Sequence, residues 1–507
     1  MNSITSPRLP KYFDFNGLLQ AGNIVCVLLA SCLYAESGGN QYVDGYTICI
    51  FMVFALQNFL LLYWEKKRRE PLLLLLMLTV IPFYMFRVAT LLYEPWSVVL
   101  PRFYVGPDQM NSSLLFIMFS VLSIALGIKS AKKPNKHFKD RSCNIQPKFN
   151  DAYLVLFIAL SLDVMNLFKL SLFGGFNGFI SIIFGTDVVI IFSMVYYILY
   201  KPVLNRTQRT IYSYSFFLFI ILRTLVGSRS AILVIVFAVI FSMLSIYEKV
   251  NISRRLVVLS VILVPIMFVV FSFSSAWRPF RNAKLAGEDV VTSSRFIMDY
   301  AQSFSQNIDE NAIKLILRPA FDRAGYLDMA ADIIANKEAY SKLINPVYYM
   351  ESVVDNLLTP GFDIFDVPKI SNGLKGVYFE SDQIKRSQVN EDYQSDMLTI
   401  FGEYYVLFKG YFAIPIFFVS GFLFNWLFCS IRADNMFLLV TYRCFVLKLY
   451  IAWLWSFGLD WQLVEASFLL ISILLISWIV TRRTVKNSIR YCRPVDIAIK
   501  RSYVASL

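Results

Sequence analysis

The chain has 507 residues, of which 57% are hydrophobic and 16% aromatic, and its mean hydropathy is +0.57. A soluble domain has too little interior to hide that much apolar surface, so the composition excludes a soluble protein and indicates a polytopic membrane protein. The net charge of +13 would favour nucleic acid as a partner in a soluble chain, but here it follows the connections between apolar runs. We therefore expect no nucleic-acid partner.

Apolar stretches recur along almost the whole chain. A helix needs roughly 20 apolar residues to cross a bilayer, and about twelve stretches approach that length. The pattern predicts an all-α polytopic membrane protein with about 12 transmembrane helices and one large helical loop. The short seventh and eighth spans could instead form one tight hairpin around Gly227 and Ser228. The predicted spans are 17–34, 43–64, 71–93, 113–129, 151–172, 178–200, 210–226, 229–246, 256–275, 405–429, 436–457 and 462–480.

Basic residues concentrate in alternate connections, at 65–70, 129–141, 201–209 and 248–255 and in the tail from Arg482. Short connections rich in Lys and Arg stay in the cytoplasm, so both termini are expected inside and the long polar segment 275–404 outside. The N-terminus lacks a small-residue cleavage site, so the first span is expected to remain as an anchor. The predicted parts are nine spans in 1–275, the large loop 276–404, three spans in 405–480 and a basic tail 481–507.

The large loop contains three stretches with apolar residues at three- and four-residue spacing, at 293–308, 321–336 and 345–358. This spacing predicts short amphipathic helices that lie on the membrane surface or pack together. The seven cysteines lie in apolar runs or basic connections and none lies in the loop, so no disulfide framework is expected.

Ionisable residues within apolar spans are costly and are functional candidates. On the predicted topology seven of them fall in the outer half of the membrane, and Lys448 lies nearer the middle. Their shared depth suggests a polar cavity open to the outside. Two alternatives stay open: the residues near the interface extend their charges to lipid headgroups, or Asp163 or Asp187 forms a structural ion pair with Arg87. The seven are Arg87, Asp163, Lys169, Asp187, Arg223, Arg229 and Glu465.

Two arginines, Arg223 and Arg229, flank a Gly-Ser turn in the stretch RTLVGSRSA, and Arg278 and Arg281 follow the ninth predicted span. Planar guanidinium groups suit phosphate oxygens, and Gly227 would let backbone N–H groups approach the same anion. The four arginines predict a site for a lipid-linked pyrophosphate, with phospholipid headgroups as the alternative ligand.

Several kinds of chemistry lack their residues. The single histidine, His137, lies in a basic connection, which excludes a Ser-His-Asp triad or a His-ligated metal on the outer side. No Walker-type glycine loop and no CxxC pair is present. An enzyme acting on the outer side would use arginine to stabilise charge and a carboxylate, or the substrate itself, to transfer the proton.

The span number, the inside termini, the large outer loop after the ninth span, the RTLVGSRSA hairpin and the loop exit GEYYVLFKG at 402–410 together resemble the O-antigen polymerase (Wzy) family. The resemblance covers nearly the whole chain in architecture, while its local motifs are short. The spaced-glycine arginine motifs of some family members are not evident here.

The resemblance implies a bacterial inner-membrane glycosyltransferase of lipopolysaccharide biosynthesis. Such enzymes move a growing glycan from undecaprenyl pyrophosphate to a sugar hydroxyl of another undecaprenyl-linked repeat unit on the periplasmic face. No cofactor, metal or nucleotide sugar is expected. A chain-length regulator and a flippase in the same membrane are the implied protein partners, beside membrane lipids.

The resemblance also gives roles to individual residues. Arg223, Arg229, Arg278 and Arg281 would neutralise the charge that grows on the pyrophosphate leaving group. Arg318 and Arg323 would bind a second pyrophosphate or sugar hydroxyls. The candidates for the general base that takes the acceptor proton are Asp322, Glu403 and Asp187.

Three other functions remain as alternatives. O-antigen ligases share the architecture, but a periplasmic histidine belongs to their active site and this chain has none in its outer segments. Transporters and repeat-unit flippases also have about 12 spans, but they are usually built from paired halves, which a large loop near the three-quarter point interrupts. A purely structural partner in an export complex would not need charges within the outer half of the membrane.

Overall fold

The structure is a computed structural model, and every regular element that it describes is helical. Six helices are long and apolar enough to cross a membrane, so the prediction of a helical membrane protein is confirmed, and six of the predicted spans coincide with them. The described residues are 14–68, 70–93, 105–131, 149–167, 186–201, 203–226, 229–246, 325–358, 364–367, 370, 399–431, 436–455 and, with short gaps, 458–474.

The first two helices, α1 (Phe15–Ser37) and α2 (Gly45–Arg68), form an antiparallel hairpin. Buried asparagines of α1 donate to carbonyl oxygens of α2: Asn16 to Leu62 at 2.6 Å and Asn23 to Ala55 at 2.9 Å. Side-chain amides commonly join helices in this way inside membranes. The hairpin is therefore held in register by polar contacts although its outer faces are apolar.

The third span is continuous but changes its winding. It consists of α3 (Pro71–Val80), the π-helical turn η1 (Ile81–Met85) and α4 (Phe86–Leu92). Pro82 lies in the π-helical turn and has no N–H to donate, so the regular ladder of hydrogen bonds cannot continue through it. Arg87 follows directly in α4.

Two helices far apart in the sequence, α5 (Pro107–Ser130) and α19 (Ala413–Ser430), pack tightly against each other. Ser123 donates to the Ile414 carbonyl at 2.7 Å and Asn425 donates to the Ile128 carbonyl. The paired positions advance together, so the helices are parallel, and an odd number of crossings must separate two parallel spanning helices. The five spans predicted between residues 151 and 275 satisfy this condition.

The parallel alignment also fixes which segments share an end of the bundle. The starts of α5 and α19 lie at one end, and the basic connection 129–141 follows α5 at the other, which we call the basic end. The segment before α19 therefore lies opposite the basic end, as the distribution of Lys and Arg predicts.

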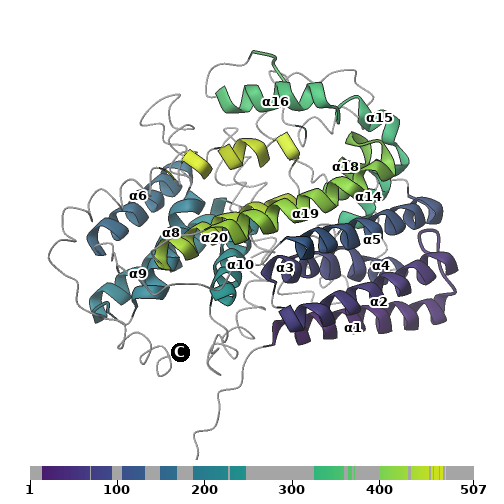
Figure 1. Cartoon of the computed structure of the whole chain (residues 1–507), viewed down its shortest axis with the longest axis horizontal. Helices are drawn as coiled ribbons and strands as arrows, with labels where there is room; N and C mark the ends of the chain where they lie inside the picture. The colour runs from purple at the N-terminus through teal and green to yellow at the C-terminus, as the bar shows by residue number, and fades with distance from the viewer. Residues whose placement is uncertain are drawn as a thin grey trace, which may run out of the picture.

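A second group of helices contains α6, α8, α9 and α10, and α20 joins it to α19 and α3. In Figure 1, α6, α8 and α9 lie to the left of the stack formed by α1 to α5. Helices α9 and α10 contact each other and flank residues 227–228, where the sequence predicts a turn between two spans. The bounds are α6 Phe149–Leu167, α8 Thr186–Tyr200, α9 Arg206–Val226, α10 Arg229–Ile246 and α20 Met436–Leu454.

Several predicted spans differ from the helices found. Within the described residues the apolar helical stretches at 152–162, 188–200, 234–245 and 462–471 are each shorter than 18 residues, and residues 256–275 lie outside the described part of the chain. The prediction that one span begins at residue 405 is wrong. Residue 405 lies within a separate helix, α18 (Ile400–Leu407), and the chain turns after it at Lys409 and Gly410, whose φ angles are positive, 55° and 82°, before α19 begins.

Helices of the large polar segment cover the end of the bundle opposite the basic end. They are α14 (Tyr326–Ala335), α15 (Lys337–Ser341), α16 (Pro346–Leu358) and α18 (Ile400–Leu407), followed by the short η4 (Gly410–Phe412). We call residues 325–358, 364–367 and 399–412 the cap. Figure 1 shows α14, α15 and α18 together at the upper right, beside α5, with α16 above them.

The predicted helices at 321–336 and 345–358 are confirmed as α14 and α16, whereas 293–308 lies outside the described residues. Helix α14 does not lie on a membrane surface. Every residue from Tyr326 to Ile334 is buried, and the helix packs against α5, α18 and η1. The cap is therefore inserted into the end of the bundle.

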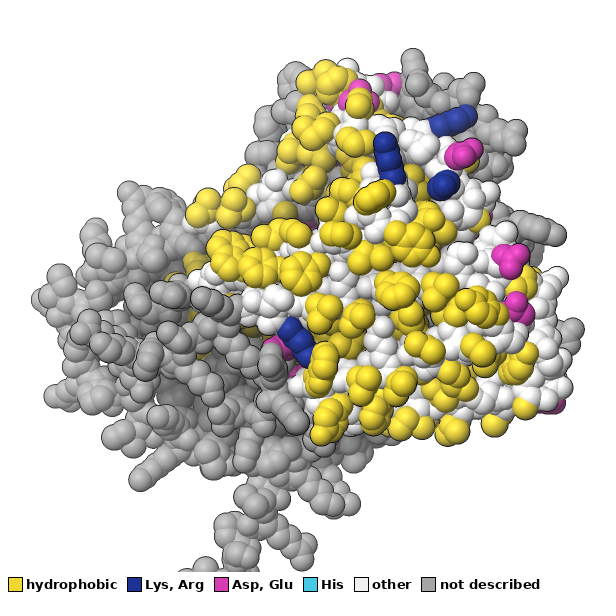
Figure 2. Space-filling model, turned by 45° about the vertical axis from the view of Figure 1, so that its right-hand side comes forward, with side chains coloured by type: hydrophobic (Ala, Val, Ile, Leu, Met, Phe, Trp, Pro, Cys, Tyr) yellow, Lys and Arg dark blue, Asp and Glu magenta, His cyan; other side chains and the backbone are white. Residues whose placement is uncertain are grey.

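A belt of exposed apolar side chains surrounds the other helices. It includes Leu28 on α1, Leu56 on α2 and Trp426 on α19, each more than half exposed. Figure 2 shows hydrophobic side chains covering much of this face, with the visible Lys and Arg side chains mostly at the upper right. Because exposing so large an apolar surface to water is unfavourable, the belt marks the surface that contacts lipid.

Candidate functional site

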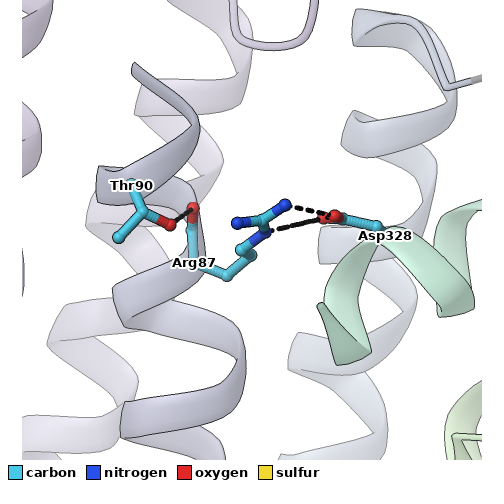
Figure 3. A network of polar contacts seen from close by, with 3 residues as sticks. All are labelled: Arg87, Thr90 and Asp328. Atoms are coloured by element: carbon cyan, nitrogen blue, oxygen red, sulfur yellow. Dashed lines mark hydrogen bonds and ion pairs between the residues drawn. The ribbon is translucent and has the colours of Figure 1, made fainter. Parts of the chain in front are cut away.

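A buried ion pair fastens the cap to the third span. The guanidinium of Arg87, on α4, donates from Nε to both carboxylate oxygens of Asp328 at 3.2 and 3.1 Å, and from Nη2 to Oδ2 at 2.6 Å. Arg87 is 2% exposed and Asp328 1%. Figure 3 shows the two side chains meeting end to end between α4 and α14, while Thr90 donates to the Arg87 carbonyl one turn along α4.

Both residues of the pair lie at positions that favour the contact. Asp328 lies in the first turn of α14, where a negative charge is stabilised by the helix dipole. Tyr326, at the start of α14, packs on Phe83 with ring centres 4.8 Å apart, and on Tyr84 at 6.1 Å. Since Tyr84 lies about 12 Å along the helix from Leu92, the start of α14 reaches well inside the bundle.

The structure pairs Arg87 with Asp328, from the large polar segment. The sequence offered Asp163 and Asp187 as its partners, and the side chains of both lie outside the described part of the structure. Removing one partner of such a buried pair strands a charge in an apolar interior, which costs about 3–5 kcal/mol. The pair thus acts as a lock that holds α14 in one position.

Glu403 forms a second buried junction. Its carboxylate, on α18, is fully buried and accepts hydrogen bonds from the Tyr349 hydroxyl of α16 and from the Leu459 amide at 2.7 Å. Burial, followed by the neighbouring Glu403 charge, raises the pKa of Tyr349 well above its usual value, so this hydroxyl stays protonated and donates. Glu403 therefore joins α16 and the chain after α20 to α18.

Two further buried carboxylates organise the chain around α16. Asp460 accepts from the Ser352 hydroxyl at 2.6 Å and from the Ile370 amide at 3.2 Å. Asp355 accepts from three backbone amides, those of residues 364, 365 and 367, at 2.9–3.1 Å. The carboxylates thereby satisfy backbone groups that have no helical partner. Each carboxylate therefore has a structural role.

An open groove of about 680 Å³ lies between α15 on one side and α18 with η4 on the other. Two exposed lysines, Lys337 and Lys409, line it, and the rest of its lining is mainly apolar or aromatic. The groove meets the apolar belt, because Phe412 is 79% exposed and the next residue begins α19. Its lining residues are Lys337, Glu338, Ser341, Tyr405, Val406, Lys409, Gly410, Tyr411 and Phe412.

Most of the residues predicted for pyrophosphate binding and catalysis lie where their side chains are not described. Arg223 lies near the end of α9, Arg229 begins α10, and Asp187 lies in the first turn of α8. The two arginines thus lie near the ends of α9 and α10 on either side of residues 227–228, which are outside the described part of the chain. Arg278, Arg281, Arg318, Asp322 and Arg323 lie outside the described residues.

The structure also pairs two charged residues that the sequence placed within membrane spans but did not predict to meet. Lys448, on α20, forms an ion pair with Glu465 on the following helical stretch. Glu465 was expected either to face a polar cavity or to extend to headgroups. The contact gives it a third role, since it neutralises a lysine inside the bundle.

The sequence missed Asp328, Asp460 and the two groove lysines. Asp328 gave no signal of its buried partner, because it shares with Asp332, four residues later, the polar face of the helix pattern at 321–336. The lysines carried no signal either, because exposed lysines are ordinary in polar segments.

Among the described residues no three His, Cys, Asp or Glu side chains are grouped to hold a metal ion. No family model matches the chain, and neither curated proteins nor solved structures include a significant match to it. The fold and the site alone define the class: a helical membrane protein whose polar segment is inserted as a cap into one end of the bundle.

Proposed function

We propose that this chain is an integral-membrane glycosyltransferase of the bacterial inner membrane. It would polymerise undecaprenyl-pyrophosphate-linked oligosaccharide repeat units into O-antigen or a related surface polysaccharide. Reaction would take place at the periplasmic face, with both termini of the chain in the cytoplasm. The observation that carries the proposal is the cap, which is fastened into the bundle at the end opposite the basic connections and opens a groove beside the lipid-facing belt.

The position of the groove suits a substrate with two unlike halves. A polyprenyl chain needs an apolar surface, whereas its pyrophosphate and sugars need a polar one. At the groove these surfaces adjoin, because exposed Tyr411 and Phe412 stand beside Lys409. Aromatic rings such as those of Tyr405 and Tyr411 offer flat apolar faces to sugar rings.

In the proposed reaction the acceptor sugar hydroxyl attacks the anomeric carbon of the donor glycan. The bond from that carbon to the pyrophosphate oxygen breaks, and lipid pyrophosphate leaves with the bonding electron pair. Arg223, Arg229, Arg278 and Arg281 would stabilise the leaving charge, and Arg318 and Arg323 would hold the second substrate. A carboxylate would take the acceptor proton.

Glu403 is one of three candidates for that carboxylate, with Asp322 and Asp187. Its oxygen already accepts from Tyr349 and Leu459, and the residue is fully buried. A base must lie within hydrogen-bond reach of the acceptor hydroxyl. The geometry therefore favours a positioning role for Glu403 and makes Asp322 and Asp187 the preferred candidates for the base.

The function can be tested on a gel of surface lipopolysaccharide from a strain that lacks this chain and from the complemented strain. A polymerase predicts lipid A-core with a single repeat unit in the mutant, and a restored ladder on complementation. Loss of every repeat unit from lipid A-core, with full polymer on the carrier lipid, would indicate a ligase. Loss of both forms would indicate a flippase, and an unchanged ladder would exclude all three.

A further inference from the structure

We propose that the groove between α15 and α18 with η4 binds the pyrophosphate of an undecaprenyl-linked glycan, with Lys337 and Lys409 as its ligands. The inference rests on the proposed function and adds a substrate position that the arginine hairpin does not supply. It starts from the juxtaposition of two exposed lysines, an open groove and the edge of the lipid-facing belt.

The charges of the groove favour an anion. Its lining contains two ammonium groups and one carboxylate, that of Glu338, all on exposed residues. No ion pair is recorded among the described residues for Lys337 or Lys409, whereas the deeper cations Arg87 and Lys448 are paired with carboxylates. Ammonium groups bind phosphate oxygens as point charges. Two of them suit a ligand with two phosphates.

The backbone at Lys409 supports a ligand role for its side chain. Lys409 has a φ of 55°, a left-handed conformation in which glycine is the usual residue after a helix. Gly410 follows with a φ of 82°, so the turn places a lysine where the backbone would favour a second glycine. A strained backbone conformation of this kind is often retained where the side chain has a function.

The surroundings set the orientation of the lipid. Phe412 and Tyr411 are 79% and 51% exposed and stand at the start of α19, whose outer face continues with exposed Val419 and Leu423. A polyprenyl chain lying along this face would keep its pyrophosphate at the level of Lys409. The groove volume of about 680 Å³ leaves room for the first sugar beside the pyrophosphate. The ligand is thus a lipid-linked pyrophosphate rather than a free phosphate.

The test is native mass spectrometry of the full-length protein in detergent, titrated with undecaprenyl pyrophosphate and, separately, with phosphatidylglycerol. We expect the double variant Lys337→Gln/Lys409→Gln to bind undecaprenyl pyrophosphate about tenfold more weakly than the wild type, because two charge-assisted contacts are lost. The matched control is Lys342→Gln, which removes an exposed lysine of the cap that does not line the groove. It should bind as the wild type does.

Lys409→Gly separates binding from folding. It removes the charge while relieving the backbone, so it should weaken binding without lowering the melting temperature. Equal binding by the wild type and the double variant would overturn the groove proposal. So would binding of phosphatidylglycerol with the same affinity and the same dependence on the lysines, because the site would then be a general headgroup site.

The two proposals fail in different ways. If the gel ladder depends on the chain but the lysine variants bind undecaprenyl pyrophosphate normally, the polymerase stands and the groove is excluded. If the ladder does not depend on the chain, the polymerase is excluded, and binding of undecaprenyl pyrophosphate that depends on the two lysines would still support the groove as a site for that lipid.

Discussion

Helices α5 and α19 meet at Gly127 and Gly421, whereas α4 and α14 are joined by the side chains of Arg87 and Asp328. A Cβ atom on either glycine would overlap a backbone carbonyl of the facing helix. The glycine contact joins two apolar helices by close approach of their backbones. The ionic contact joins a span to a segment that is otherwise polar.

The difference shows how one chain solves two packing problems. Apolar helices gain little by burying apolar surface against each other in lipid, so their backbones approach closely and side-chain amides bond across them. The cap has to be held in one position at the end of the bundle, and the Arg87–Asp328 pair and the Glu403 junction specify that position. We therefore expect changes to buried charges to act on the cap more strongly than changes to the glycine contact.

The largest effect is expected at Arg87. Arg87→Met leaves the Asp328 carboxylate buried without its guanidinium, which should destabilise the cap by about 3–5 kcal/mol. Limited trypsin digestion of the purified protein would report this as faster cleavage after Lys337 and Lys342.

The double variant Arg87→Met/Asp328→Leu is the control, since it removes both charges and should recover most of the loss. A double variant as unstable as Arg87→Met would contradict the role of the ion pair as a lock.

A smaller effect is expected in the bundle. Gly421→Ala places a methyl group against the Ile124 carbonyl and should cost about 1–3 kcal/mol, because the two backbones must separate. Thermal unfolding in detergent would measure it. Gly22→Ala, on α1, is the matched control: its nearest neighbour would be an Ile81 methyl group at 3.7 Å, so the change should be neutral or stabilising. Equal melting temperatures for the two variants would refute the close contact.

At the Glu403 junction, Tyr349→Phe removes one donor to a buried carboxylate and should cost about 1–3 kcal/mol. Tyr214→Phe, on a residue that is 70% exposed, should change stability by less than about 0.5 kcal/mol. The same digestion assay separates them, and no difference between the variants would show that the junction contributes nothing.

The Tyr349 hydroxyl also predicts a pH dependence. Burial and the Glu403 charge raise its folded-state pKa, so its contribution is complete below the unfolded pKa of about 10. It is lost as the pH rises from there towards the folded-state pKa. Stability above about pH 10 should thus fall less steeply in Tyr349→Phe than in the wild type; equal slopes would contradict the shift.

The smallest effect has the opposite sign. Lys409→Gly relieves a left-handed lysine and should stabilise the protein by up to about 1 kcal/mol, whereas Lys342→Gly, at a residue with an ordinary helical φ of −62°, should destabilise it by about 0.5–1 kcal/mol. Thermal unfolding of the two variants side by side measures the contrast. A loss of stability in Lys409→Gly would mean that the lysine side chain itself stabilises the turn.

The sequence predicts part of this architecture. Apolar length identifies the six long helices, the Lys and Arg distribution agrees with the parallel alignment of α5 and α19, and three- to four-residue spacing finds α14 and α16. The sequence does not predict the break after α18, because the left-handed position at Lys409 is not occupied by the glycine that usually marks such a turn.

The site was harder to predict. The burial of Glu403 was not foreseen, because the residues that surround it come from α16 and from the chain after α20. Arg87 was recognised as a charge inside a span, but its partner lies 241 positions away in a polar segment. Local spacing carries no information on such a contact. The arginines Arg278, Arg281, Arg318 and Arg323 remain sequence predictions.

The most direct test of the cap and its side of the membrane is labelling of engineered cysteines with a membrane-impermeant maleimide. Lys342→Cys lies on the cap and Ser130→Cys at the basic end of α5, and both residues are exposed. With the native cysteines replaced by alanine, we expect Lys342→Cys to react in cells whose outer membrane is permeabilised. Ser130→Cys should react only after the inner membrane is opened. The reverse pattern would place the cap in the cytoplasm and contradict a periplasmic site.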